Sequence, residues 1–371
     1  MRTTGIAFAV ALTLAHAGAA QAGKLIVAAY GLDSAACGTR RAPCRSIGRA
    51  IANAAAGDRI EVGPGRYGDL DGDDAPDAGP GEETVTAGVM IRIAKPLQIV
   101  SRDGSGVTVI DGGGSARVQA AVLIESDDVV FGRRKRGFTI TGAGVAISCR
   151  DTVRNVHIEG NWARGNGVGF FVDGPGTTVV GNRAIANDGT GFVISSTAGY
   201  VAGNVATANT LGFFVRGANN RLVDNVASAN RPSGLVAGVL VRAPTLLEGN
   251  VVTGNRGAGI GIYAGGDGTR IAGNRIVGNT DIGIDVGAGS LVGDLVITRN
   301  DIFGNDALRG PGGSVNCGLW NGTGAPLAAP ENYWGAAAGP GSDPADVTCR
   351  DAVTTDPVAD KPFRVRAKAA R

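Results

Sequence analysis

The side chains that carry most enzyme chemistry are sparse in this chain. Its 371 residues include 2 histidines, and His16 lies in an apolar N-terminal segment that we expect to be removed. His157 directly precedes the apolar Ile158 in a segment of alternating character, so we expect it on the outer surface. Unless His157 itself serves, this composition argues against Ser-His-Asp or Cys-His catalysis, and it disfavours a histidine-ligated metal.

An acidic stretch offers the first candidate metal site. In the sequence GDLDGDDAPD (68–77), Asp69, Asp71 and Asp73 have the spacing of the first ligands of a calcium loop. However, Asp74 occupies the position where such a loop needs glycine, and residue 80 is Pro80 rather than glutamate. We therefore expect a solvated acidic loop, with calcium binding by these three aspartates as the alternative.

The N-terminus predicts export. Arg2 precedes the apolar stretch 6–15, and Ala20 and Ala22 form a small-residue cleavage pattern at the end of a 22-residue signal peptide. No later segment is long and apolar enough to span a bilayer. The net charge of +2 gives no general reason to expect a nucleic-acid partner. We expect a secreted or periplasmic monomer.

The five cysteines suit an oxidising compartment. Cys37 and Cys44 enclose a short loop, and Cys317 and Cys349 bracket the last irregular segment, so we expect these two disulfides. Cys149 is then left as a buried free thiol. Other pairings of five cysteines remain open from the sequence.

Most of the chain is organised by an internal repeat. Pairs of asparagines five residues apart recur at intervals of 21 to 26 residues. Branched apolar residues precede the first asparagine of each pair by three positions, and small or branched residues follow it by two. This period of two is typical of short strands, and identical positions stack when each repeat forms one coil of a parallel β-solenoid. We expect asparagine at the bends because it tolerates left-handed backbone, and stacked amides to bond along the axis. The pairs are Asn161/Asn166, Asn182/Asn187, Asn204/Asn209, Asn225/Asn230, Asn250/Asn255, Asn274/Asn279 and Asn300/Asn305.

A third strand follows the second asparagine of each coil, and its alternating residues predict an inner and an outer face. Two inward columns are entirely apolar: Phe170, Phe192, Phe213, Val239, Ile260, Ile284, and then Val172, Ile194, Val215, Val241, Ile262, Val286. Two outward columns are mixed: Phe171, Val193, Phe214, Leu240, Gly261, Asp285, and then Asp173, Ser195, Arg216, Arg242, Tyr263, Gly287. The first outward column predicts an exposed apolar stripe, which a solvent-facing strand has no structural need to carry.

Both ends of a solenoid need a cap, because an open coil exposes its core. Ser46 is a suitable N-cap and Gly57 a suitable end for a short helix over 46–57 that covers the first coil. The predicted organisation is a signal peptide (1–22), an N-terminal cap (23–57), β-helix coils (58–305) and a C-terminal cap with tail (306–371).

These features resemble the right-handed parallel β-helix proteins of the pectin-lyase-like superfamily. The segment 37–67 is similar to their usual N-terminal entry and 331–344 to a common closing segment. The paired-asparagine coils resemble the carbohydrate-binding and sugar-hydrolase repeats, a group that includes the periplasmic accessory family of nitrous oxide reductase. The fold class is therefore expected to be all-β, a right-handed parallel β-helix with a short N-terminal capping helix. The superfamily hosts several functions, so the resemblance is specific for fold rather than activity.

The resemblance implies that a ligand lies along the outer face of the third strand and its stacked copies. Paired guanidinium groups suit the carboxylates of an acidic polysaccharide, and aromatic side chains suit sugar rings. The expected ligand-binding residues are Phe171, Asp173, Phe214, Arg216, Arg242, Tyr263 and Asp285.

Two alternatives use the same face. A polysaccharide lyase or epimerase would use Arg216 or Arg242 as the base, with Asp285, Asp281 and Asp173 as calcium ligands. Neither a polygalacturonase-type aspartate cluster nor a DPH motif occurs, which counts against it. A non-catalytic accessory protein would instead dock a partner on the stripe. We expect no cofactor, with calcium as the alternative in the acidic loop or in the lyase hypothesis.

Overall fold

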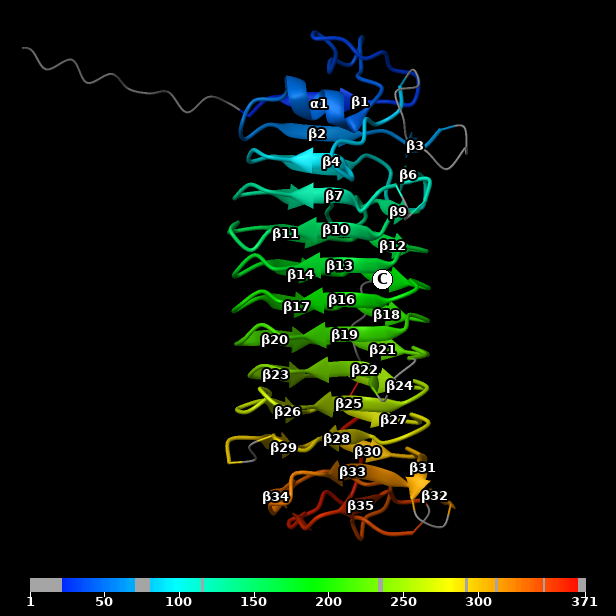
Figure 1. Cartoon of the computed structure of the whole chain (residues 1–371), viewed down its shortest axis with the longest axis vertical. Coiled ribbons are helices and arrows are strands. Elements are labelled where there is room, and N and C mark those ends of the chain that lie inside the picture. The colour runs from blue at the N-terminus through cyan, green and yellow to red at the C-terminus, as the bar shows by residue number, and fades with distance from the viewer. Residues whose placement is uncertain are drawn as a thin grey trace, which may run out of the picture.

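The computed structural model describes residues 22–70, 81–114, 117–232, 236–290, 293–310, 313–342 and 344–365. It is a right-handed parallel β-helix: Figure 1 shows the strands stacked as successive coils along one long axis. The expected signal peptide falls almost entirely outside the described residues, as do Asp71 and Asp73. No helix in the described ranges is long and apolar enough to cross a membrane.

Three parallel sheets form the walls of the solenoid. Sheet A consists of β1 (Lys24–Val27), β2 (Arg59–Val62), β5 (Gln98–Ser101), β8 (Val130–Phe131), β11 (His157–Glu159), β14 (Thr178–Val180), β17 (Tyr200–Ala202), β20 (Asn220–Val223), β23 (Thr245–Glu248), β26 (Arg270–Ala272) and β29 (Val296–Thr298). Sheet B consists of β3 (Gly65–Gly68), β6 (Thr108–Asp111), β9 (Thr139–Thr141), β12 (Trp162–Arg164), β15 (Arg183–Ile185), β18 (Val205–Thr207), β21 (Val226–Ser228), β24 (Val251–Thr253), β27 (Arg275–Val277) and β30 (Asp301–Phe303).

The outer face of sheet C carries the residues that we predicted from the sequence to bind a ligand. Sheet C consists of β4 (Val89–Ile93), β7 (Ala120–Ile124), β10 (Val145–Cys149), β13 (Val168–Val172), β16 (Thr190–Ile194), β19 (Leu211–Val215), β22 (Val236–Val241), β25 (Ala258–Ile262), β28 (Ile284–Val286), β33 (Cys317–Asn321) and β35 (Val347–Arg350). The last two strands extend this sheet into the expected C-terminal cap. Two small pairs complete the fold: antiparallel β31 (Ala307–Gly310) with β32 (Gly313–Val315), and parallel β34 (Leu327–Ala328) with β36 (Val353–Thr354).

The inward columns form the core as predicted. All twelve side chains are at most 2% exposed. Phe170, Phe192 and Phe213 stack with ring centroids 4.6 and 4.8 Å apart, which is the spacing of neighbouring strands. Burial of each large side chain contributes about 1.5–3 kcal/mol, so one continuous core holds the coils together.

The asparagine pairs form two buried ladders. The Nδ2 of each asparagine donates to the Oδ1 of the equivalent residue in the next coil, as from Asn204 to Asn225 at 3.0 Å and from Asn225 to Asn250 at 3.0 Å. The first ladder runs on to Asn332, and the second ends where Asn305 donates to the Asp346 carboxylate. The predicted bonding along the axis is confirmed.

The prediction that asparagine itself takes the left-handed conformation is wrong. In every pair the residue before each asparagine has the positive φ instead, as at Ala208 (58°) and Asp224 (54°). The asparagine side chain points inward to bond backbone groups, so its own backbone stays in the ordinary region. The preceding position makes the bend, which explains the glycines found there. Ala186, Ala208 and Ala229 adopt the same left-handed conformation although their Cβ makes it less favourable.

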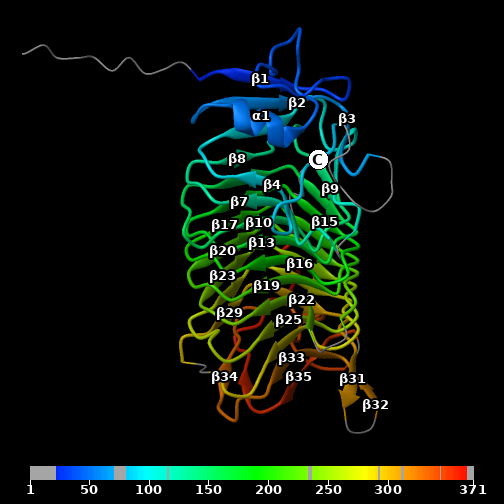
Figure 2. The same ribbon diagram turned by 45° about the horizontal axis from the view of Figure 1, so that its top comes forward.

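The N-terminal cap is the helix α1 (Ile47–Asn53). The Ser46 hydroxyl accepts from the Arg49 amide, confirming the predicted N-cap, whereas the helix ends at Asn53 rather than Gly57. Ala54 is extended, and the Asp58 carboxylate accepts from the Ala55 amide, so 54–58 is a turn. Figure 2 shows this end of the stack, with α1 beside β2 and β4.

The cysteines are arranged as expected. Disulfides join Cys37 to Cys44 and Cys317 to Cys349, and Cys149 is a buried free thiol. Burial raises the pKa of the Cys149 thiol to about 11, which keeps it protonated and unreactive.

Candidate functional site

The outer face of sheet C brings the two outward columns into register. The strand pairing places Phe171 beside Val193, Val193 beside Phe214, and Phe214 beside Leu240. The column continues through Gly261 and Asp285 to Trp320 of β33. Residues from seven different repeats thereby form one continuous surface, about 4.8 Å per step.

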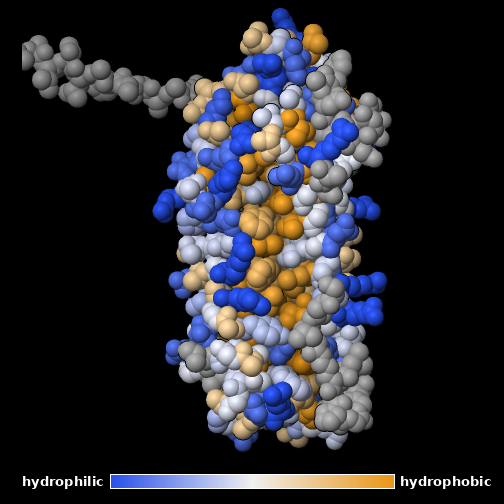
Figure 3. All heavy atoms as spheres, in the orientation of Figure 1, coloured by the Kyte–Doolittle hydropathy of each residue, from blue (hydrophilic) through white to orange (hydrophobic). Residues whose placement is uncertain are grey.

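An apolar stripe runs along this face, and Figure 3 shows it in the orientation of Figure 1. We define the stripe by its half-buried and buried apolar side chains: Val168, Phe171, Val193, Leu211, Phe214, Val236, Leu240 and Trp320. The prediction of a uniformly exposed stripe is wrong at Val193 and Asp285, which are each 6% exposed. Neighbouring coils carry larger side chains in the same column, and these cover the smaller ones.

Arg216 and Arg242 lie next to each other beside the stripe. Val215 pairs with Val241, so the following arginines occupy adjacent coils, and both are exposed. Arg216 donates from Nε to the Ser195 hydroxyl at 2.6 Å, and its guanidinium lies 5.4 Å from the Phe171 ring centroid. These contacts orient Arg216 while its terminal nitrogens form no salt bridge with any described residue.

Tyr263 and Asp285 form a pair rather than two separate binding groups. The Tyr263 hydroxyl donates to the Asp285 carboxylate at 2.6 Å. The tyrosine ring lies over two glycines, since a Cβ added to Gly287 or Gly261 would be 2.4 or 2.8 Å from it. The ring is therefore held flat against the sheet, with one side toward the strands.

Two of the three aspartates considered as calcium ligands lie far apart along the axis. Asp173 follows β13 and Asp285 lies in β28, which is five strand spacings, or about 24 Å, further along sheet C. No ion bridges such a distance, because calcium–oxygen bonds are about 2.3–2.6 Å long. Asp173 therefore cannot ligate the same calcium ion as Asp285, and the lyase hypothesis stays an alternative without a ligand set formed by all three aspartates.

Two other candidates lie away from sheet C. Asp69 is buried at the end of sheet B, where its amide donates to Asp111. The other two residues of the acidic loop, Asp71 and Asp73, are outside the described residues. His157 is half-buried on β11 with Nε2 3.0 Å from the Glu159 carboxylate, which is the outward position expected.

Sequence reasoning missed Trp320 and Leu211. The segment CGLWN of β33 has the same pattern as LGFFV of β19, so a repeat search extended past Asn305 could have found Trp320. Leu211 precedes the glycine of its coil, and packing alone reveals that it joins Leu240 and Trp320 in one apolar cluster.

The coils, the asparagine ladders and the apolar outer wall define a right-handed parallel β-helix protein of the pectin-lyase-like class. The chain belongs to the NosD family, described as periplasmic copper-binding protein, whose model matches residues 90–241 and 195–339. No curated protein matches the chain by sequence.

Several solved structures are similar in fold. A rhamnogalacturonan lyase is 12% identical, covers 91% of this chain and 87% of its own, and gives a TM-score of 0.52. The GH136 lacto-N-biosidase from Eubacterium ramulus is 12% identical, covers 75% of this chain and 63% of its own, and also gives 0.52. At such identity these likenesses show the fold alone.

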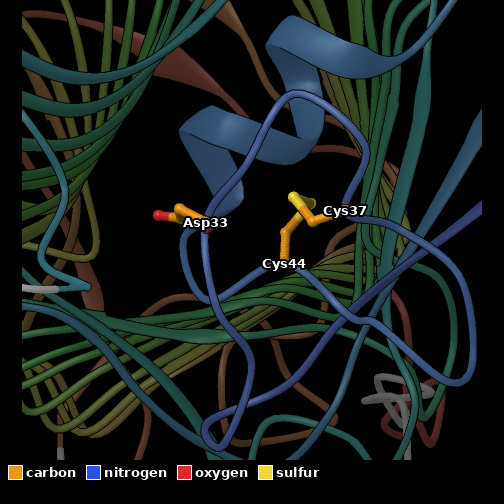
Figure 4. A group of neighbouring side chains, drawn as sticks. All are labelled: Asp33, Cys37 and Cys44. Atoms are coloured by element: carbon orange, nitrogen blue, oxygen red, sulfur yellow. A yellow bond between two sulfur atoms is a disulfide. The ribbon is translucent and has the colours of Figure 1, made fainter.

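The family description names copper, and the described residues offer few ligands for it. Protein copper sites use imidazole, thiolate and thioether ligands. Of the described residues, His157 lies outside on β11, Cys149 points into the core from β10, and Met90 is buried in β4. Among the described ranges, the one group of three close His, Cys, Asp or Glu ligands is Asp33, Cys37 and Cys44 (Figure 4), where both sulfurs are in a disulfide. The described residues do not fit a copper site.

Proposed function

We propose that this chain is a periplasmic or secreted protein that binds an extended acidic polysaccharide along the outer face of sheet C. The observation that carries the proposal is the placement of Arg216 and Arg242 on adjacent coils, directly beside the apolar stripe. The family's periplasmic description and the expected signal peptide support the location.

The chemistry of the face suits a uronate chain. Neighbouring coils are about 4.8 Å apart, which is close to the length of one sugar residue in an extended chain. Successive residues of such a chain can therefore meet successive coils. The two guanidinium groups can each receive a carboxylate through charge-assisted hydrogen bonds.

The remaining predicted residues take different parts. Phe214 offers an apolar face for the C–H side of a sugar ring, and Phe171 supports the guanidinium of Arg216. The Tyr263 ring presents its outer side to the ligand. Its hydroxyl donates to the Asp285 carboxylate, so Asp285 positions Tyr263 and does not itself contact the ligand. Asp173 follows Val172, which pairs with Cys149, so Asp173 lies beside Arg150 of the neighbouring coil.

The experiment is titration of the purified protein with polygalacturonate and alginate, with neutral dextran as the comparison glycan. Replacing both arginines (Arg216→Ala with Arg242→Ala) should weaken uronate binding about tenfold or more per arginine, since hydrogen bonds to charged groups contribute about 1.5–3 kcal/mol each. Raising the salt concentration should weaken binding in the wild type more than in the variant.

The matched control removes two exposed arginines from the outer face of sheet A, Arg221→Ala with Arg270→Ala. Its net charge equals that of the test variant, so any general charge effect is the same in both. Equal loss of affinity in the two variants would refute a site on sheet C. Accumulation of unsaturated uronate product would instead favour a lyase, and unchanged binding in the test variant would leave the stripe as a docking surface.

A further inference from the structure

A cavity lies at the N-terminal end of the same face. It has a volume of about 440 Å³ and is lined by α1, by the segment 82–86 and by β4. Its lining is mixed: Val89, Met90 and Ala52 are apolar, Arg49 and Arg92 are basic, and Asp33, Glu82 and Glu83 are acidic. A cavity of this size is in the range of small-molecule sites and accommodates a sugar ring.

The cavity is continuous with the wall that carries the stripe. Arg92 lines the cavity, and its register partner on β7 is Leu123, which stands above Ser148 and then Phe171 in the outward column. Val89, which also lines the cavity, packs with Ala120 and Leu123 in one small outer cluster. A chain lying along the stripe therefore leads toward the cavity.

Sheet C ends at this point. β4 is its terminal strand, and α1 packs against it. The segment 82–86 folds back beside β4, where the Thr86 and Val89 amides each donate to the other's carbonyl at 2.9 and 3.0 Å. The Glu83 carboxylate accepts from the amides of Ile47 and Gly48, which ties this segment to α1. These contacts form a wall across the end of the face.

The cavity presents the groups that a terminal sugar needs. The hydroxyls of Thr84 and Thr86 and the guanidinium of Arg49 are on exposed residues that line it. Arg49 forms no salt bridge with any described residue. Three carboxylates also line the cavity, and each accepts from backbone amides: Asp33 from Arg45 and Ser46, Glu82 from Leu70, and Glu83 from Ile47 and Gly48. Arg49 is then the group placed to receive the carboxylate of a uronate ring, with the threonine hydroxyls and the apolar side chains for its hydroxyls and C–H face.

We propose that this cavity holds the terminal residue of the acidic glycan, so that the protein recognises chain ends. This assignment rests on the proposed function, and it adds a site for one end of the glycan at the β4 end of the binding face. From the cavity at β4 to Arg242 after β22 there are six strand spacings, about 29 Å, so an oligomer of roughly six residues spans both.

The test compares two size classes of polygalacturonate at equal mass, with the full chain as the binding protein. If chain ends are recognised, the amount of protein bound at saturation follows the number of chains, and the shorter class binds more. If bound protein follows total sugar mass instead, the end-recognition assignment is overturned while the proposed function stands. Absence of binding to every size class overturns the proposed function, and the assignment with it.

A variant addresses the cavity directly. Thr84→Trp places a large ring in the cavity from an exposed position, and should weaken binding of a six-residue uronate oligomer about tenfold. The control Thr354→Trp adds the same ring to exposed β36 at the opposite end, and should leave affinity unchanged. Equal affinities for the two variants, with wild-type thermal stability in both, would overturn the assignment.

Discussion

Replacement of Asn225 by alanine should be among the most destabilising single changes that the coils allow. Asn225 is 2% exposed, and its Oδ1 accepts from the amide and the Nδ2 of Asn204 at 2.9 and 3.0 Å. Its Nδ2 donates to the Val201 carbonyl at 2.9 Å and to Asn250 at 3.0 Å. Alanine removes all four bonds at a site that is buried in the stack.

The magnitude follows from the groups left without partners. The Asn204 amide and the Val201 carbonyl each lose the Asn225 side chain, and an unsatisfied buried group costs about 1–3 kcal/mol. The Asn225→Ala variant should therefore lose roughly 2–6 kcal/mol of unfolding free energy. Ser228→Ala is the control, because Ser228 lies half-buried on the outer side of the same coil and should change stability by about 0.5 kcal/mol or less.

Two measurements are needed because a solenoid can unfold in parts. Urea denaturation followed by circular dichroism gives the overall loss, and amide hydrogen exchange gives the local loss in β17 and β20. We expect exchange to accelerate in both strands for Asn225→Ala and in neither for Ser228→Ala. A change of less than about 1 kcal/mol, with exchange unaltered, would refute the structural role assigned to the ladder.

Two further predictions concern the core and the N-terminal cap. Phe192→Ala should cost about 3–5 kcal/mol, because the ring is stacked between Phe170 and Phe213 and its loss leaves a cavity; calorimetry showing a nearly unchanged melting temperature would contradict this. Burial raises the pKa of Glu83 to about 7 from the ordinary 4.5, so the folded protein holds this proton more tightly than the unfolded chain and stability falls as the pH rises from about 4.5 to beyond 7. Between pH 6 and 7.5 the wild type should lose about 1 kcal/mol through this group, and Glu83→Gln should remove that loss in urea titrations; an identical pH dependence in both proteins would refute it.

Much of the architecture could be predicted from sequence because a solenoid repeats one local pattern. The alternation within GFFVDG or GFVISS determines which side chains face inward, and stacking of like residues then follows from the repeat length. The inward columns and the asparagine ladders depend on this regularity, whereas the two disulfides were predicted from the spacing of cysteines outside the repeats. The position of the left-handed residue did not follow, since glycine and asparagine both adopt that conformation and only the backbone shows that the residue before each asparagine has it, even where that residue is alanine.

What the sequence by itself determined is the set of residues on the outer wall of sheet C and their order along the axis. Only the tertiary structure decided what those side chains contact. The Arg216 guanidinium packs over the Phe171 ring, the Tyr263 hydroxyl donates to Asp285, and Asp173 lies five strand spacings from Asp285. It also decided that Glu83 ties the segment 82–86 to α1 and closes the face beside β4. The physical reason is that period and register place each Cα, whereas the direction of a long side chain and the path of a non-repeating segment depend on contacts between residues distant in sequence.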